Sequence, residues 1–304
     1  MKILLIHPHD IYSVDEPWTS RIRNVAKELS HKGHEVKLVY FPLPSTEKNS
    51  NSDTKKLEGV ETIPLNRNKW AIIKNISKVY TLSKWADIVH FQKCFAYASL
   101  PAIFGAYFAN KHLHYDWDDW EYMIYRASGP SKLVGFYINV LEIIIPRMVD
   151  TISVASDYLK VLAQQRGVPE EKIFESHVCA DLRVFKPKNP RRVKKKYHIR
   201  FPLVLYQGQL QGAQYAYLFI ESAKIVQQEI SDVKFMIVGG GYNLPKLKEL
   251  AKSLGLERNI IFTDFVLHEE VPDYISVADV VVACFEENDL TKCKSPLKIV
   301  EYMA

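Results

Sequence analysis

Cysteine is scarce in this sequence of 304 residues, and the four that it has are scattered. None of them forms a C-x-x-C pair, so neither a zinc site nor a disulfide framework is indicated. Such usage is typical of a reduced protein, and we expect a cytoplasmic chain. A long apolar run is also missing. The most apolar stretch, Leu133 to Met148, is interrupted by Asn139, Glu142 and Pro146, and is too short and too polar to span a bilayer.

Glycine and proline are also few, at 12 and 15 residues, which excludes a collagen-like or linker-dominated chain. Hydrophobic residues make up 47% of the sequence and the net charge is only +5, so a disordered chain is excluded. This mild basicity fits an anionic ligand or an anionic membrane surface, but it is too weak to predict nucleic-acid binding. The opening MKILLIHPHD predicts a buried strand and not a signal peptide.

What the sequence does contain is a repeated alternation of apolar strand-length runs and helical patterns. The first set of strands is expected at Lys2–His7, Val36–Phe41, Val60–Pro64, Asp87–Phe91, Leu113–Asp116 and Thr151–Val154. The second set is expected at Leu203–Tyr206, Lys234–Val238, Ile260–Thr263 and Val280–Cys284. Helices are expected between them, at Ser20–Lys32, Tyr217–Glu229, Leu244–Leu254 and Val271–Ala278. Two α/β domains with parallel sheets follow from this pattern.

Lys186 to Arg200 separates the two sets and contains two prolines and a basic run at residues 191–196. We place the domain boundary here, with an N-terminal domain at 1–187 and a C-terminal domain at 188–304. The basic run is best explained as a solvated surface, and a membrane-surface role is the second interpretation.

Ligands of parallel α/β sheets bind beyond the carboxyl ends of the strands. Gly239, Gly240 and Gly241 follow one predicted strand, and such a turn lets backbone N–H groups approach a phosphate. The last residues predict a helix with Ser295 as N-cap and Pro296 at its first position. Lys298 and Glu301, three residues apart, then share one face of this helix and suit a phosphate and a pair of sugar hydroxyls.

SPLKIVEYMA at the C-terminus resembles the signature region of the retaining glycosyltransferases of the GT-B fold, the group 1 glycosyl transferases. HEVKLVYFP, DLRVFKP, LYQGQLQGAQYAYLFIESA, KFMIVGGGYNLPKLKELAKSLGL and NIIFTDFVLHEEVPDYISVADVVVACF resemble further segments of that family in the same order. The resemblance covers nearly the whole chain. It implies two Rossmann-like domains with parallel sheets facing a central cleft, the second domain being incomplete because a further strand–helix unit and a terminal helix are expected after Ala304.

In that family, the second glutamate of an E-x7-E motif holds the ribose hydroxyls of the donor, which implies this role for Glu301. The first glutamate of the motif is replaced by Cys293, and the Arg and Lys that neutralise the donor diphosphate are replaced by Gln209 and Gln214. We expect Lys298 to supply the missing charge. The full expected donor-binding set is Gly208, Gln209, Gln214, Gly239, Gly240, Ser295, Pro296, Lys298 and Glu301.

On the acceptor side, the resemblance implies that Trp18, Thr19 and Arg21 lie under the transferred sugar. Asp118 and Asp119 follow a predicted strand within an acidic and aromatic segment, and we take them as candidate catalytic residues that serve a sugar or an acceptor. The same segment contains a D-x-D spacing, Asp116 and Asp118, which would also suit a metal ion. The resemblance implies that no metal is needed to hold the donor.

The resemblance implies a hexosyltransferase-type enzyme that moves a sugar from a nucleotide-diphosphate sugar to a glycan, lipid-linked or small-molecule acceptor with retention of configuration. It implies no cofactor and no nucleic-acid partner, and we expect peripheral contact with the inner face of a membrane. Two alternatives stay open: a non-catalytic GT-B protein that binds sugar nucleotides or glycans, and a GT-B sugar-nucleotide epimerase.

Overall fold

The computed structural model describes residues 1–13, 16–44, 57–210 and 215–304. Contacts within the chain divide it into two compact units. The first comprises residues 1–177 and 292–295, and the second comprises residues 178–291 and 296–304. The predicted boundary between residues 187 and 188 lies inside the second of these units.

The first unit is built on a seven-stranded sheet in the order β3-β2-β1-β4-β5-β6-β7, and every neighbouring pair is parallel. Its strands are β1 (Lys2–Ile6), β2 (Glu35–Tyr40), β3 (Val60–Pro64), β4 (Ile88–Gln92), β5 (His112–Trp117), β6 (Thr151–Val154) and β7 (Ile173–Glu175). Because the strands are parallel, the polar residues that follow β1, β4 and β5 all reach the same edge of the sheet.

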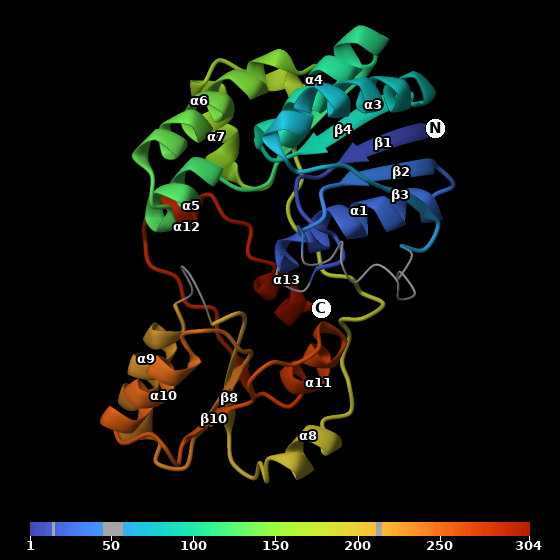
Figure 1. The fold of residues 1–304 in the computed structure, drawn as a ribbon. Coiled ribbons are helices and arrows are strands. Elements are labelled where there is room, and N and C mark those ends of the chain that lie inside the picture. Colours follow the sequence, from blue (N-terminus) through green and yellow to red (C-terminus); the bar gives the residue numbers. More distant parts are fainter. Residues whose placement is uncertain (14–15, 45–56, 211–214) are drawn as a thin grey trace. The chain divides into compact units, whose positions relative to one another are not determined.

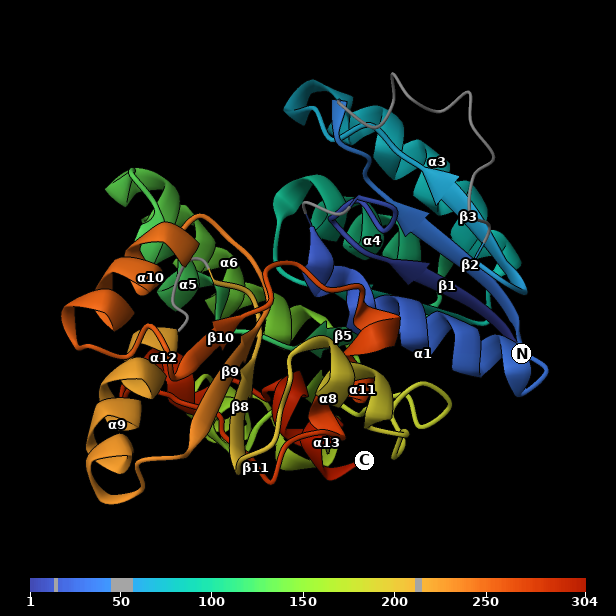
Figure 2. The ribbon, with the colours of Figure 1, turned by 90° about the horizontal axis from the view of Figure 1, so that it is seen from below.

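Helices cover both faces of this sheet (Figures 1 and 2). They are α1 (Ser20–His31), α3 (Ile72–Trp85), α4 (Ala96–Ala109), α5 (Glu121–Ser128), α6 (Lys132–Met148) and α7 (Asp157–Gln165), with short 3-10 turns η1 (Pro17–Thr19), η2 (Lys69–Ala71) and η3 (Glu170–Lys172). One core joins α3, α4, α6 and α7 to residues such as Leu4 and Ile6 of β1. The other joins α1 to Ile3 and Leu5 of the same strand. Alternate residues of β1 thus serve the two faces, as expected for a strand buried on both sides.

The second unit has a four-stranded parallel sheet in the order β10-β9-β8-β11. Its strands are β8 (Leu203–Gln207), β9 (Lys234–Val238), β10 (Ile260–Phe262) and β11 (Val280–Val281). Its helices are α8 (Arg191–Lys196), α9 (Ala216–Glu229), α10 (Leu244–Ser253), α11 (Val271–Ile275), α12 (Asp289–Lys292) and α13 (Leu297–Met303), with a 3-10 turn η4 (His268–Glu270). Two cores again lie on the two faces of the sheet.

The predicted start of the last helix is wrong by one residue. Pro296 precedes the helix with extended backbone angles, φ −72° and ψ 113°, and the first helical residue is Leu297. The proline ring is compatible with helical φ, but the extended ψ leaves this residue outside the helix. Ser295 therefore does not stand at the N-cap, and it is grouped with the first unit. The sequence also gave no sign of the short strand β7.

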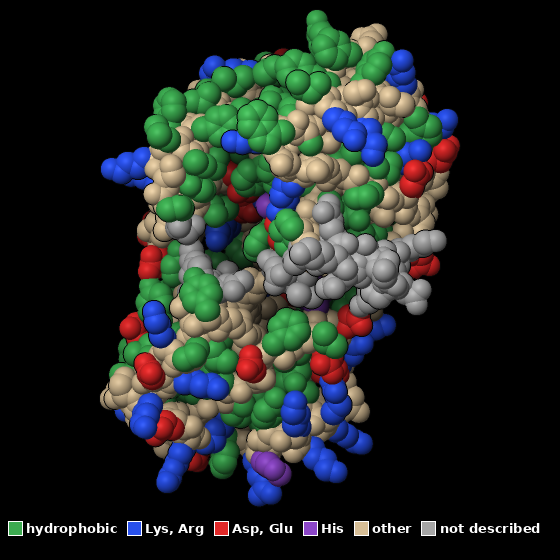
Figure 3. Space-filling model, viewed as in Figure 1, with side chains coloured by type: hydrophobic (Ala, Val, Ile, Leu, Met, Phe, Trp, Pro, Cys, Tyr) green, Lys and Arg blue, Asp and Glu red, His purple; other side chains and the backbone are tan. Residues whose placement is uncertain are grey.

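Among the described residues, no helix is both long enough and apolar enough to cross a membrane. The apolar stretch Leu133 to Met148 forms most of α6. Figure 3 shows hydrophobic side chains gathered on the part of the first unit where α4 and α6 run.

Candidate functional site

Glu301 is a buried polar side chain of the second unit. It lies on α13, is only 4% exposed, and uses both carboxylate oxygens. The amide nitrogen of Gln207 donates to Oε2 at 2.6 Å, and Nε2 of His268 lies 2.7 Å from Oε1. Gln207 is the last residue of β8, and His268 begins η4. A buried carboxylate with two partners is a strong, oriented acceptor at the carboxyl edge of the sheet.

Lys298 and Tyr302 extend from the same helix toward the end of β8. The Lys298 ammonium donates to the Tyr206 hydroxyl at 3.1 Å and lies 4.3 Å from the centre of its ring. The Tyr302 hydroxyl accepts from the backbone N–H of Gln207 at 2.8 Å. The spacing of one helical turn thus places a cation and a carboxylate at one strand end, as the sequence predicted. Their ligand-binding roles stay predictions.

Two glycine-containing loops follow β8 and β9. Gly208, Gly239 and Gly241 all have positive φ, at 150°, 138° and 153°. A Cβ atom on Gly239 would collide with the carbonyl oxygen of Gly208, and one on Gly240 would lie 2.6 Å from Asp264 Oδ1. The backbone therefore requires glycine at position 239, whereas at Gly240 the nearest obstacle is the side chain of Asp264. Gly208, Gly239 and Gly240 are the predicted donor-binding glycines, and the two loops are adjacent, since the N–H of Leu210 donates to the Gly240 carbonyl at 2.9 Å.

The remaining predicted donor residues are placed differently. Gln209 follows Gly208 in the β8 loop, whereas Gln214 lies outside the described residues. Cys293, the position of the missing first glutamate, is fully buried in the core of the first unit. Its carbonyl accepts from the Ser156 hydroxyl at 2.8 Å. The side chain at position 293 therefore packs in the core of the first unit.

The first unit gathers a lysine and three carboxylates at the carboxyl edge of its sheet. The Lys93 ammonium lies 2.5 Å from Glu121, 3.3 Å from Asp118 and 3.4 Å from Asp119. Lys93 follows β4, is buried, and has a left-handed backbone with φ 64°. We call these four residues the Lys93 cluster.

Electrostatics in this cluster follow from burial and proximity. Burial by itself lowers the pKa of Lys93, but the carboxylates, Asp118 first, outweigh it and raise that pKa well above its ordinary value. Burial, together with the neighbouring carboxylates, raises the pKa of Asp118 to about 7 against the opposing effect of Lys93. Asp118 is therefore poised near neutrality, a property common at binding and catalytic sites.

The three carboxylates of the Lys93 cluster have ligand atoms close enough together to hold a metal ion. Their ligand type suits a hard cation such as magnesium or manganese. The Lys93 ammonium already provides a positive charge at this position. A second group within the described residues, Asp157, Glu175 and His177, is exposed.

Arg21, an expected acceptor-side residue, is engaged within the first unit. Its Nε and Nη2 each donate to a different oxygen of Asp116 at 2.8 Å, and Nη2 also donates to the Ser176 carbonyl. Gln92 and Ser153 donate to the same carboxylate. Burial opposes ionisation of Asp116, but Arg21 outweighs it and holds the pKa of Asp116 well below its usual range. This pair ties α1 to β5.

The other two acceptor-side residues lie on η1. Trp18 is 45% exposed, and its ring meets the His9 ring edge-on at 5.6 Å between centres. Thr19 is buried. Trp18 can therefore present a ring face or edge to a ligand, whereas Thr19 packs inside.

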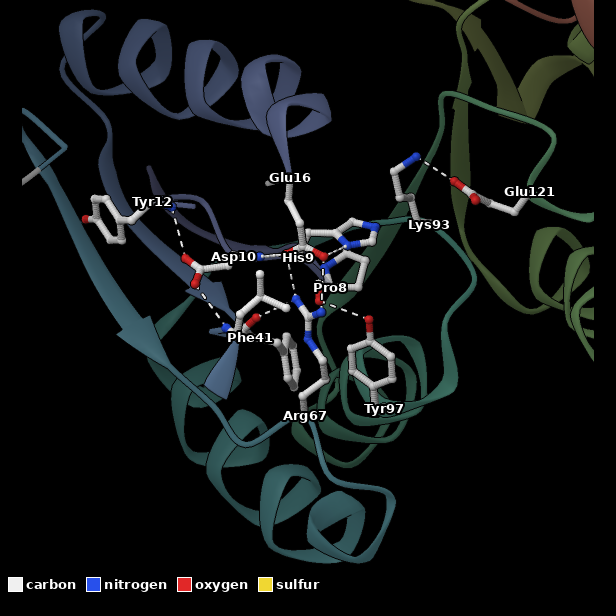
Figure 4. A network of polar contacts seen from close by, with 11 residues as sticks. Pro8, His9, Asp10, Tyr12, Glu16, Phe41, Arg67, Lys93, Tyr97 and Glu121 are labelled. Carbon is white, nitrogen blue, oxygen red and sulfur yellow. Dashed lines mark hydrogen bonds and ion pairs between the residues drawn. The ribbon is translucent and has the colours of Figure 1, made fainter. Parts of the chain in front are cut away.

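Sequence reasoning missed a polar network around Glu16 (Figure 4). Glu16 accepts from Arg67 at 3.1 and 2.7 Å and from the backbone of Asp10 at 2.6 Å, and Nδ1 of His9 lies 2.8 Å from it. Burial opposes ionisation of Glu16, but His9 and Arg67 outweigh it and lower its pKa to about 2. The signal was available, since the polar residues His9 and Asp10 lie in the loop that follows β1.

Comparisons with known proteins agree with this geometry. Residues 201–304 match the sequence profile of the family described as "Glycosyl transferases group 1". The chain is also 33% identical over 81 residues to an alpha-D-kanosaminyltransferase of Streptomyces kanamyceticus. That segment is 27% of this chain and only 21% of the relative.

Solved structures resemble almost the whole chain. HepE of Anabaena, determined with UDP and glucose, has a TM-score of 0.66 and 15% identity, over 94% of this chain and 74% of HepE. WaaG, a glycosyltransferase involved in lipopolysaccharide biosynthesis, has a TM-score of 0.62 and 13% identity, over 95% of this chain and 76% of WaaG. The fold is GT-B. The expected α/β class with parallel sheets in a GT-B arrangement is thereby confirmed.

Proposed function

We propose that this GT-B chain is a glycosyltransferase that uses a nucleotide-diphosphate sugar, which is bound by the second unit. The observation that carries the proposal is Glu301, buried and oriented by Gln207 and His268 at the end of β8. This geometry lies inside the segment that matches the group 1 family. A neighbour of the same fold, HepE, has been determined with UDP-glucose, which supports a donor of this chemical class.

In the proposed complex, Glu301 accepts hydrogen bonds from the two ribose hydroxyls. One of them takes the place of His268 at Oε1, which the high exposure of the His268 side chain, 57%, makes accessible. The glycine loops after β8 and β9 allow the diphosphate to approach the backbone N–H groups. Lys298 supplies the positive charge.

Transfer would depend on positioning and on stabilisation of the departing diphosphate. We propose retention of configuration with a hexosyl donor, the leaving phosphate accepting the proton of the attacking hydroxyl. On the first unit, Asp118, Asp119 and Trp18 would contact the transferred sugar or the acceptor. A glycan, lipid-linked or small-molecule acceptor and a cytoplasmic location are parts of the same proposal.

We propose that no divalent ion is required, because Lys93 already neutralises the carboxylates that could bind one. Activity should persist in excess EDTA, measured as sugar transfer with and without added manganese. Loss of transfer in EDTA that manganese restores would contradict this part of the proposal.

A non-catalytic sugar-nucleotide-binding protein is the second candidate. It is favoured by the neutral Gln209 and Gln214 at the positions where the family resemblance implies cations. At about 4 Å and an effective dielectric constant of about 20, each missing charge pair removes roughly 4 kcal/mol of attraction before desolvation. An epimerase of the same fold would instead isomerise or hydrolyse the donor without an acceptor.

Calorimetry with a panel of nucleoside diphosphates and their sugars tests the proposal, followed by product analysis. Binding of one base together with acceptor-dependent release of its diphosphate would support the transferase. Binding without turnover would favour the non-catalytic protein, and acceptor-independent conversion would favour the epimerase. No binding of any nucleotide would overturn all three.

A further inference from the structure

The outer surface of α4 and α6 is apolar where a helix on the surface of a protein is usually polar. On α4, Tyr107 is 77% exposed, and Phe104 and Phe108 are also exposed, with ring centres 6.1 Å apart. On α6, Leu133 is 82% exposed. Further exposed side chains on α6 are Val134, Phe136, Tyr137, Ile144 and Met148. We call these nine residues the α4–α6 face.

These side chains form stripes and are not scattered. Phe104 and Phe108 are four residues apart, as are Leu133 and Tyr137, so each pair lies on one side of its helix. The opposite side of α6 is buried and includes Gly135, Ile138 and Ile145. Both helices pack on the same face of the seven-stranded sheet, since their buried residues belong to one core. Each helix is thus apolar on its inner and on its outer side.

Positive charge predominates around these two helices, although the exposed Asp150 follows α6 and lies 3.9 Å from His112. No charged residue occurs in α4, and the single acid of α6, Glu142, points inward. Glu142 is fully buried and accepts from Trp117 and from the backbone N–H groups of Glu121 and Tyr122. The outer side of α6 therefore carries no negative charge. Positive residues flank the two helices, namely Lys111 after α4, Arg126 on α5 and Lys132 at the start of α6.

Exposed aromatic and aliphatic side chains with a basic margin match a bilayer that contains anionic lipids. Tyrosine side chains such as Tyr107 and Tyr137 suit the headgroup level, and lysines are attracted by the negative surface potential. We propose that the α4–α6 face docks this protein on an anionic lipid bilayer. The inference does not depend on the proposed transferase activity, and it adds a partner that the second-unit site does not address.

This face replaces the basic run at residues 191–196 as the membrane candidate. That run forms α8, where Arg192 pairs with Glu270 and Asp273. Two of its charges, Lys194 and Lys195, are exposed and offer a matched control. The control shows whether positive charge anywhere on the chain suffices for binding.

Sedimentation of the full chain with vesicles tests the proposal. Vesicles of phosphatidylcholine with one third phosphatidylglycerol should bind the protein, and pure phosphatidylcholine should bind it much more weakly. The double variant Phe108→Ser/Leu133→Ser should reduce binding at least tenfold. Ile225→Ser/Ile230→Ser removes two exposed aliphatic side chains of the second unit and should leave binding unchanged.

For charge, Lys111→Gln/Lys132→Gln should weaken binding by about fivefold per residue, whereas Lys194→Gln/Lys195→Gln should have little effect. Nucleotide binding by calorimetry should be unchanged in all four variants, which separates this test from that of the proposed function. No vesicle binding by the unmodified chain, or equal binding by all variants, would overturn the proposal. So would conversion of a dimer to a monomer by Phe108→Ser/Leu133→Ser, because the face would then be a subunit interface.

Discussion

Lys298 illustrates, at the scale of one residue, how a side chain can serve a ligand or the fold. Its ammonium stacks on Tyr206 in the structure, and in the proposed complex it faces the diphosphate. Lys298→Met keeps most of the apolar stem and removes the charge. It should weaken binding of the diphosphate nucleotide at least tenfold and hardly affect the nucleoside, because only the former carries the charge.

Calorimetry with both ligands measures this difference, with Lys246→Met as the control on α10. Equal weakening of nucleoside and diphosphate would show that Lys298 only packs the site. Replacement of Gln209 by Arg in the Lys298→Met background should recover part of the affinity.

Lys93 needs no ligand to balance its charge, because three carboxylates of the same chain surround its ammonium. Lys93→Met should lower the free energy of unfolding by about 3–5 kcal/mol, because it leaves buried carboxylates without a cation. Adding Glu121→Gln should recover part of the loss by removing one of those charges. Urea unfolding followed by circular dichroism measures both, and the exposed Lys69→Met should change stability by less than about 0.5 kcal/mol. A Lys93→Met protein as stable as the unmodified chain would contradict the cluster as described.

At the scale of elements, α5 begins where Glu142 of α6 accepts its free N–H groups. Glu142 receives the backbone N–H of Glu121 at 2.9 Å and of Tyr122 at 3.1 Å, and also the Trp117 indole. Glu142→Gln places an NH2 group against one of these donors and should destabilise the protein by about 1–3 kcal/mol. Chemical denaturation measures the free energy of unfolding of this variant and of a control, the exposed Glu171→Gln, which should not change it. Equal stability of the two variants would show that Glu142 does not cap α5.

Most strands could be predicted because parallel strands buried on both faces are continuous apolar runs. Helices α1, α9, α10 and α11 were also predicted, whereas α3, α4, α5, α6 and α7 were not. β7 could not be predicted, since only Ile173 of its three residues is buried and the strand lies at the sheet edge. The start of α13 was misplaced because Pro296 fits both the first helical position and the residue before it. The Lys93 cluster joins two segments that only the parallel register of β4 and β5 brings together. Sequence spacing alone does not contain that register.

At the scale of the whole molecule, the proposal assigns donor binding to the second unit and contact with the transferred sugar or the acceptor to the first. The second unit holds Glu301, Lys298 and the glycine loops, while the first holds the Lys93 cluster and Trp18. The candidate residues on α13 were predicted from helical spacing, and those after β8 from the family resemblance. His268 was not, because its contact with Glu301 joins positions 33 residues apart.

Nucleotide affinity of Glu301→Gln is the most direct test of the central claim, that the second unit binds a nucleotide-diphosphate sugar through this carboxylate. The ligand is uridine diphosphate, or the diphosphate that the panel identifies, and the matched control is the exposed neighbour Glu269→Gln. Isothermal calorimetry should show at least tenfold weaker binding for Glu301→Gln, about 1.4 kcal/mol, and unchanged binding for Glu269→Gln. Equal affinity of both variants and the unmodified chain, with circular dichroism unaltered, would contradict the account.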